Sequence, residues 1–321
     1  MDKDAICKVK YDDYNYKERM LLMYTDKCTA NCLHCAAESS TSNNTKMSMD
    51  EAKKYLQVAA AKNFKCILWS GGEVFIYFNE ILKLTEYGKS LGLVFTIDTN
   101  AFWAQSEEVA YGKLKLLKEA GVIHIDVSCD AFHMKFVPVK NIITAVKAAL
   151  DLGISSRVSF TYSGDKEVDH MLLSILKEQE VPFVESEMAK VGFAKKLPDE
   201  LFGSIEIADL MGCEELGPLV RTDGSIIGCC NPTVSKESPV HIGLGKDNFE
   251  DKIDNYLNSK CINLLANLGF RKLYNLLKED KTFEPYKKKK YSHNCEFCFD
   301  LFNDKELYQR TMDYIEKYEG V

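Results

Sequence analysis

The cysteines are the side chains of this 321-residue chain with the clearest chemical potential, and three of them stand close together. Cys28, Cys32 and Cys35 have the spacing C-x3-C-x2-C. Three thiolates can hold three irons of a four-iron, four-sulfur cluster and leave the fourth iron open to a substrate. A zinc site would need His34 or a distant residue as its fourth ligand. His34 lies between Cys32 and Cys35 in the sequence, so the chain leaves it little freedom to reach the same ion. The spacing therefore favours an iron–sulfur cluster with one open iron.

A second group of cysteines lies in the C-terminal third of the chain. Its spacing reads C-x10-G-x4-C, followed at once by another cysteine and, far downstream, by C-x2-C. The members are Cys213, Cys229, Cys230, Cys295 and Cys298. The other cysteines lack metal spacing, and we expect them to be buried as small hydrophobic residues. They are Cys7, Cys66, Cys129 and Cys261.

Composition indicates a globular protein with reduced thiols. Hydrophobic residues make up 46% of the chain and charged residues 28%, which is ordinary usage for a folded domain. The net charge of −7 disfavours nucleic acid as a partner. The N-terminus has no apolar signal segment, and no stretch approaches the roughly 20 apolar residues of a membrane span. We expect a cytoplasmic protein whose grouped cysteines bind metal rather than form disulfides. The basic run Lys287–Lys290 is interpreted as a solvated linker, with docking of an acidic peptide as the alternative.

The elements that must position these thiols follow from the apolar pattern. From residue 19 to residue 188, short β-branched runs alternate with helical patterns, which predicts six parallel βα units. Ser48 and Glu51 form a capping box that starts the first helix. The triplet follows the first strand, at the edge of a parallel sheet where such folds place their chemistry. The predicted strands are Arg19–Thr25, Cys66–Ser70, Val94–Thr99, Val122–Ser128, Ser156–Tyr162 and Phe183–Met188.

The rhythm changes after Pro198. Residues Ile205 to Gly228 are typical of a hairpin with Asp223-Gly224 at its turn, and a helical stretch near Asn248 to Leu277 follows. We therefore expect an α/β barrel part followed by a small α+β part. The expected division is an N-terminal extension at residues 1–18, the βα units at 19–197 and a second domain at 198–321.

The triplet after the first strand closely resembles the mark of the radical S-adenosylmethionine (SAM) superfamily, whose fold is a partial (β/α)6 barrel. Gly71-Gly72-Glu73 ends the second strand, where that superfamily has a GGE motif that binds the ammonium group of SAM. Thr99-Asn100 resembles its TNG motif, although Ala101 replaces the glycine. Asp130 follows the fourth strand, where relatives contact SAM. The alternative is that Asp130 caps a helix or has another structural role. The SAM contacts that the resemblance implies are Gly71, Gly72, Glu73, Asn100, Ser128, Asp130 and His34.

The second cysteine group resembles the twitch domain, a shortened SPASM extension of radical SAM enzymes that holds one auxiliary [4Fe-4S] cluster. The resemblance implies a second cluster, and a zinc site with the same four thiolates is the alternative. We expect the two hairpin arms to bring Cys213 and Cys229 together and a C-x2-C loop to close the site. The implied ligands are Cys213, Cys229, Cys295 and Cys298. Cys230 is left over, either as a spare ligand or as a thiol that gives a hydrogen atom to a substrate radical.

Several strings along the chain resemble the radical SAM peptide epimerases that make epipeptides. They are Gly71–Phe75, Asn100–Trp103, Ser128–His133, Asp223–Pro232 and Cys295–Asn303. In that family the second cysteine of the adjacent pair returns hydrogen to the substrate, a role that falls here on Cys230. The resemblance implies that a 5'-deoxyadenosyl radical removes the α-hydrogen of an L-residue in a ribosomal peptide and that the thiol makes the D-residue.

The resemblance also implies partners: a ribosomal precursor peptide and an electron donor of the flavodoxin or ferredoxin type. Fewer than 30 residues precede the triplet, so we expect the peptide to be recognised by the barrel mouth, the second domain or a separate protein. Two alternatives keep the radical chemistry, namely a dehydrogenase and a peptide maturase that makes thioether or carbon–carbon crosslinks. A third is a non-catalytic iron–sulfur protein.

Overall fold

The computed structural model describes residues 13–210, 213, 216–246, 248–267, 269–287 and 290–317. Six parallel strands form the first part of the sheet, in the order β6-β5-β4-β3-β2-β1. They are β1 (Arg19–Thr25), β2 (Cys66–Gly71), β3 (Val94–Thr99), β4 (Val122–Cys129), β5 (Ser155–Thr161) and β6 (Phe183–Ser186). Each lies within two residues of its predicted bounds, so the six predicted strands are confirmed.

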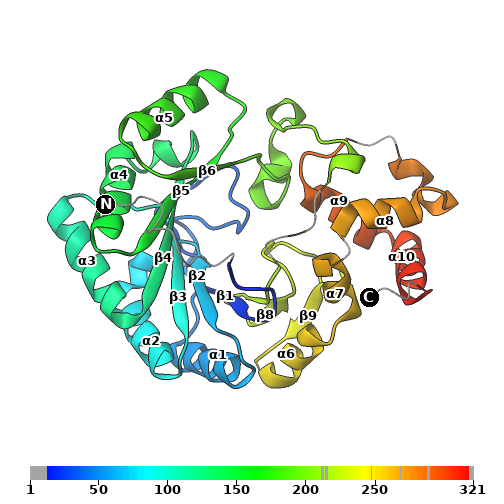
Figure 1. Ribbon diagram of the computed structural model, residues 1–321, viewed down its shortest axis with the longest axis horizontal. Coiled ribbons are helices and arrows are strands. Elements are labelled where there is room, and N and C mark those ends of the chain that lie inside the picture. The colour runs from blue at the N-terminus through cyan, green and yellow to red at the C-terminus, as the bar shows by residue number, and fades with distance from the viewer. Residues whose placement is uncertain are drawn as a thin grey trace.

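Five helices connect these strands and lie together along the outer side of the sheet (Figure 1). They are α1 (Met49–Ala61), α2 (Phe78–Ser90), α3 (Glu107–Ala120), α4 (Val139–Asp151) and α5 (Lys166–Glu178). Strand side chains such as Trp69, Phe95 and Phe160 are fully buried. They belong to the same hydrophobic core as the buried side chains of the helices. Strand β6 is followed by the 3-10 turns η5 (Gly192–Lys196) and η6 (Asp199–Leu201) in place of an α-helix.

The capping box at the start of α1 is confirmed. The hydroxyl of Ser48 accepts from the backbone N–H of Glu51, and the Glu51 carboxylate accepts from the backbone N–H of Ser48 at 3.0 Å. This arrangement satisfies two of the helix N–H groups that lack intrahelical partners. It fixes where α1 begins after the long loop that carries the cysteine triplet.

Three further strands extend the same sheet beyond β1, in the order β7-β8-β9. β7 (Leu219–Val220) runs parallel to β1, and β8 (Ser225–Ile227) and β9 (His241–Leu244) continue in antiparallel fashion. The Asp223-Gly224 turn is confirmed, with Gly224 at a φ of 84°. The predicted first arm from Ile205 was too long. Pro218 cannot donate to a strand ladder, and the strand starts only at the next residue.

The C-terminal helices enclose a second core, on the side of the molecule away from α3 (Figure 1). The predicted helical stretch is confirmed as α6 (Phe249–Leu257), α7 (Lys260–Asn267) and α8 (Gly269–Leu277). The turn η8 (Lys281–Tyr286) and the helices α9 (Asn294–Asn303) and α10 (Lys305–Lys317) complete this part. Aromatic side chains fill its core, namely Tyr256, Phe270, Phe283, Tyr291 and Phe297.

Backbone pairing crosses the expected boundary at residue 197, because β7 pairs with β1 through Leu21–Leu219 and Leu22–Val220. The two parts therefore share one sheet, and the division into domains stays a prediction. Cys7, Lys288 and Lys289 lie outside the described residues, whereas Lys287 and Lys290 form surface ion pairs with Glu284 and Glu206. Among the described helices, none has the length and apolar character needed to cross a membrane.

The capping box gives a testable contribution to stability. Ser48→Ala should lower the free energy of unfolding by about 1 kcal/mol, because the N–H of Glu51 loses its acceptor at the helix start. Urea unfolding followed by circular dichroism measures this change. Ser174→Ala, on the exposed face of α5, is the control and should shift the value by no more than about 0.5 kcal/mol. Equal effects of both substitutions would show that the cap contributes nothing.

Candidate active site

A cavity of about 510 Å³ lies at the carboxyl ends of the parallel strands. Cys28, Cys32 and Cys35 all line it, together with residues from the ends of β2 to β6. The triplet sits on the loop between β1 and α1, as predicted. The structure therefore brings the three thiols and the strand-end residues of the sequence analysis, except Glu73, to one cavity.

Three different parts of the barrel hold the three cysteines of the loop. The side-chain amide of Asn100, after β3, donates a long 3.7 Å hydrogen bond to the sulfur of Cys28. His133, after β4, hydrogen-bonds the thiol of Cys32. The backbone N–H of Phe193, in η5, donates to the carbonyl oxygen of Cys35 at 3.0 Å. The irregular loop thus takes its shape from distant segments of the chain.

The predicted Gly71-Gly72 pair supports the loop from the neighbouring strand. A Cβ atom at Gly72 would lie 2.1 Å from the carbonyl oxygen of Lys27, directly before the triplet. Gly71 has a φ of 126°, and a Cβ there would lie 2.2 Å from the carbonyl oxygen of Thr25. The N–H of Gly72 donates to that same Thr25 oxygen at 2.7 Å. Only glycine permits this approach of two backbones, and both glycines also line the cavity.

Glu73, the third residue of the motif, points into the protein. It is fully buried, is absent from the cavity lining, and its carboxylate accepts from the N–H groups of Phe75 and Asn100 and from the hydroxyl of Thr99 at 2.8–3.1 Å. Burial raises the pKa of Glu73 to about 7, against the effect of these donors. Its observed contacts hold the loop after β3, and a direct contact with SAM stays a prediction.

The loop after β3 keeps the required turn although it lacks glycine. Ala101 has a φ of 61°, so an alanine adopts the left-handed conformation there. The Asn100 side chain accepts from the N–H of Phe102 at 3.0 Å and lines the cavity. The replacement of glycine by alanine therefore leaves Asn100 facing the triplet.

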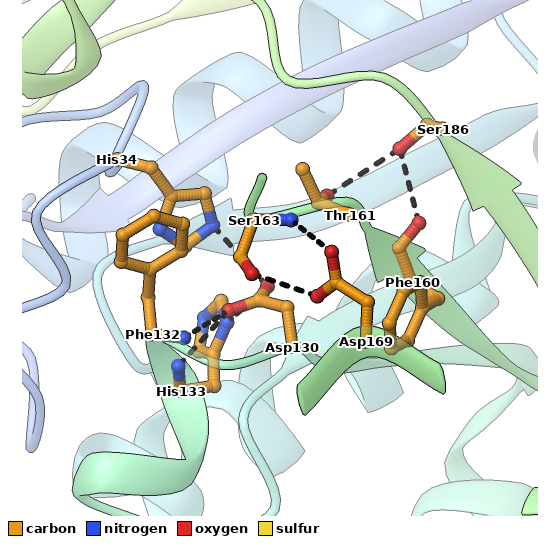
Figure 2. Close-up of polar contacts among 9 residues, drawn as sticks. All are labelled: His34, Asp130, Phe132, His133, Phe160, Thr161, Ser163, Asp169 and Ser186. Carbon is orange, nitrogen blue, oxygen red and sulfur yellow. Dashed lines mark hydrogen bonds and ion pairs between the residues drawn. The ribbon is translucent and has the colours of Figure 1, made fainter. Parts of the chain in front are cut away.

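Ser128, Asp130 and His34 also line the cavity (Figure 2 shows Asp130 and His34). The Asp130 carboxylate lies 2.7 Å from Nδ1 of His133 and 3.2 Å from Nε2 of His34. Burial opposes its ionisation, yet the two histidines hold the pKa of Asp130 well below its usual range. We singled out His34 as a candidate SAM contact, but the sequence did not reveal that His34 and Asp130 are paired.

A second cavity, of about 310 Å³, is lined by all five cysteines of the C-terminal group. Burial and the neighbouring Cys213 raise the pKa of Cys229 to about 12. Burial also raises the pKa of Cys298, to which the nearby Cys229, Cys295 and Cys213 contribute. As thiolates, these buried and closely spaced cysteines would repel one another. Such a donor set suits a cationic iron–sulfur core or zinc. Cys261 is also near Cys298 but lines neither cavity. Cys66, Cys129 and Cys261 are all buried, in keeping with their predicted role as small core residues.

The C-x2-C pair lies on a helix, and our expectation of a loop was wrong. Cys295 lies in the first turn of α9, and Cys298 follows at the start of the second turn. His293 is the N-cap residue, and its Nδ1 accepts from the N–H of Cys295 at 3.2 Å. The capping histidine explains why the helix begins at this point.

The two cavities adjoin through four shared lining residues, which are Cys230, Asn231, His293 and Cys295. Cys229 lines only the second cavity, whereas its neighbour Cys230 lines both. The adjacent cysteines thus have different surroundings. We did not identify Asn231 or His293 from the sequence, although the position of His293 two residues before C-x2-C was an available signal.

Comparison with known proteins agrees with this geometry. Residues 22–178 match the model of the radical SAM superfamily. The protein YydG of Bacillus subtilis (strain 168), whose name assigns it to peptide biosynthesis, is 28% identical over 319 residues, covering 94% of this chain and 98% of YydG. The AdoMet-dependent heme synthase of Methanosarcina barkeri (strain Fusaro / DSM 804) is 30% identical over 107 residues, which are 33% of this chain and 29% of that protein.

A solved structure shows the same fold over nearly the whole chain. The structure of native anSMEcpe with bound AdoMet and the Kp18Cys peptide has a TM-score of 0.57 and 12% identity, and the match covers 93% of this chain and 97% of that one. The predicted α/β fold, a partial barrel of parallel βα units with a C-terminal extension, is therefore confirmed. Residues 22–178 of this chain form a radical SAM domain, the kind of domain that works with a [4Fe-4S] cluster and SAM.

Proposed function

We propose that this protein converts L-residues of a ribosomally made peptide into D-residues. One observation carries the proposal: Cys230 lines both the cavity of the cysteine triplet and the cavity of the second cysteine group. A thiol in that position can reach a substrate in the first cavity while its neighbour Cys229 belongs to the second. The similarity to YydG supports a peptide as the substrate.

The first cavity would hold the cofactors. Cys28, Cys32 and Cys35 are the proposed ligands of the SAM cluster, and Gly71, Gly72, Asn100, Ser128 and His34 line the space that SAM would fill. When bound, the cluster would pass one electron to SAM, and SAM, on releasing methionine, would supply a 5'-deoxyadenosyl radical able to take the α-hydrogen of the target residue as a hydrogen atom. The chain then needs no general base for this step, so we assign no acid or base role to His133.

Cys230 is the proposed hydrogen donor. Its S–H bond breaks as a C–H bond forms on the face of the planar α-carbon radical opposite to the one that lost hydrogen, and the configuration inverts. The remaining sulfur radical needs one electron and one proton to become a thiol again. An auxiliary cluster on Cys213, Cys229, Cys295 and Cys298 would supply the electron, drawn in turn from a flavodoxin or ferredoxin type donor. Residues 198–321 would form the twitch domain that carries this cluster.

The reaction can be read as a change of mass in heavy water. Anaerobically reconstituted protein, SAM, dithionite and a synthetic copy of a short peptide encoded beside its gene are incubated in D2O. Because a thiol exchanges its hydrogen with solvent, each inverted residue should gain one mass unit by mass spectrometry, and 5'-deoxyadenosine should form. Acid hydrolysis and chiral chromatography should show the same residue as its D-form.

A different mass change would contradict epimerisation. Loss of two hydrogens would indicate a dehydrogenase or a crosslinking maturase. Absence of SAM cleavage with both clusters present would point to a non-catalytic iron–sulfur protein.

Replacement of the donor separates the two half-reactions. Cys230→Ala should retain SAM cleavage and abolish D-residue formation, since the substrate radical forms but has no thiol to quench it. Cys66→Ala is the matched control, because Cys66 is fully buried in β2 and faces neither cavity. It should retain both activities. Loss of the auxiliary cluster in Cys230→Ala would mean that Cys230 is a ligand.

Metal analysis tests the second cysteine group. Two [4Fe-4S] clusters correspond to about eight irons per chain, so Cys298→Ala should reduce iron to about four while the SAM-dependent spectroscopic signal of the first cluster persists. Cys261→Ala serves as the control, since that thiol lies close by without lining the cavity. Stoichiometric zinc in the purified wild-type protein, lost in Cys298→Ala, would favour a zinc site.

A further inference from the structure

The acceptor positions of the Asp130 carboxylate are all taken by nitrogen atoms of the protein. Asp130 follows β4 and is 1% exposed. Its Oδ1 accepts from the backbone N–H groups of Phe132 and His133 at 2.9 and 3.0 Å. Its Oδ2 lies 2.7 Å from Nδ1 of His133 and 3.2 Å from Nε2 of His34 (Figure 2). An ionised carboxylate has about four acceptor positions, and four nitrogen atoms already surround this one. A ribose hydroxyl would have to displace one of them.

His34 connects this carboxylate to the cysteine loop. It stands between Cys32 and Cys35 in the sequence, and its ring stacks on Phe132 with centroids 4.4 Å apart and an interplanar angle of 22°. The edge of His133 completes the contact at 5.2 Å and 88°. Figure 2 shows the His34 ring beside Phe132 and above the Asp130 carboxylate. The segment after β4 thus binds the His34 side chain of the loop through Asp130, Phe132 and His133.

The same carboxylate reaches the loop a second time through His133. That ring bonds Asp130 through Nδ1 and also hydrogen-bonds the thiol of Cys32. Asp130 therefore contacts His34 of the loop directly and reaches Cys32 through the ring of His133. Leu33, which lies between these positions, is 55% exposed and gives the loop little anchorage of its own.

We propose that Asp130 is a positioning residue for the SAM cluster, which it serves by fixing the cysteine loop at His34 directly and at Cys32 through His133, and that it does not bind SAM. Three thiolates on an irregular loop must meet at one cluster, and ordering such a loop costs conformational entropy. Contacts that order the loop in advance lower this cost. Partners behind metal ligands typically change metal affinity by 10- to 100-fold when they are removed.

The test compares three substitutions in the full-length, reconstituted protein. Asp130→Asn keeps the shape but removes the acceptor at Oδ2. His34→Phe retains the ring that stacks on Phe132 and removes only the link to Asp130. Asp169→Asn is the matched control, since Asp169 is also a buried carboxylate at this end of the barrel but accepts from the N–H and hydroxyl of Ser163 at 3.0 and 2.7 Å (Figure 2).

The readout is cluster retention under an iron chelator, which needs no peptide and is independent of the proposed epimerisation. In Asp130→Asn and His34→Phe, the paramagnetic resonance signal that responds to SAM should decay about 10- to 100-fold faster than in wild type. The signal of the auxiliary cluster should decay as before. In Asp169→Asn both signals should decay at the wild-type rates. SAM affinity, measured by calorimetry on freshly loaded protein, should be unchanged in Asp130→Asn.

Two results would overturn the proposal. A weakened SAM affinity in Asp130→Asn with normal cluster retention would make Asp130 a SAM contact. Equally rapid decay of the SAM-responsive signal in Asp169→Asn would show that any buried charge at this end of the barrel has the same effect. If Asp130→Asn fails to fold, His34→Phe decides alone, and normal cluster retention in that variant contradicts the proposal.

Discussion

The structure depends on the close contact between two backbones at the carboxyl ends of β1 and β2. Gly71 and Gly72 approach the carbonyl oxygens of Thr25 and Lys27 so closely that a single Cβ would overlap them. This contact sets where the chain leaves β1 and enters the cysteine loop. The thiols that follow can face the cavity only because the second strand permits the approach.

The rest of the loop is fixed from the other strand ends. Asn100 reaches Cys28, Asp130 and His133 reach positions 32 and 34, and Phe193 reaches Cys35. Glu73 orders the loop after β3 in the same manner, since it bonds Thr99 and Asn100. Residues that the family resemblance assigns to the cofactor therefore also support one another. Binding groups and supporting groups form one network at this edge of the sheet.

The second part of the molecule is joined to the first by backbone hydrogen bonds rather than by side-chain packing alone. β7 pairs with β1, and the β7–β8 hairpin leads to the adjacent cysteines Cys229 and Cys230. Because the hairpin is part of the same sheet, its end has a defined position relative to the first cavity. That geometry lets two neighbouring cysteines line different sets of cavities, which is the basis for assigning them different roles.

The sequence by itself determined the six parallel strands, the start of α1 and the grouping of the thiols, because these follow from local periodicity, capping and spacing. It also pointed to the residues after each strand, since the carboxyl ends of parallel strands must share one edge. Only the tertiary structure decided which way Glu73 points, that Asp130 is saturated by two histidines and two backbone N–H groups, and that Cys295 and Cys298 lie on a helix. It alone placed Cys230, Asn231, His293 and Cys295 between two cavities. These outcomes depend on which distant segments come to lie beside each group, and neither residue type nor spacing along the chain contains that information.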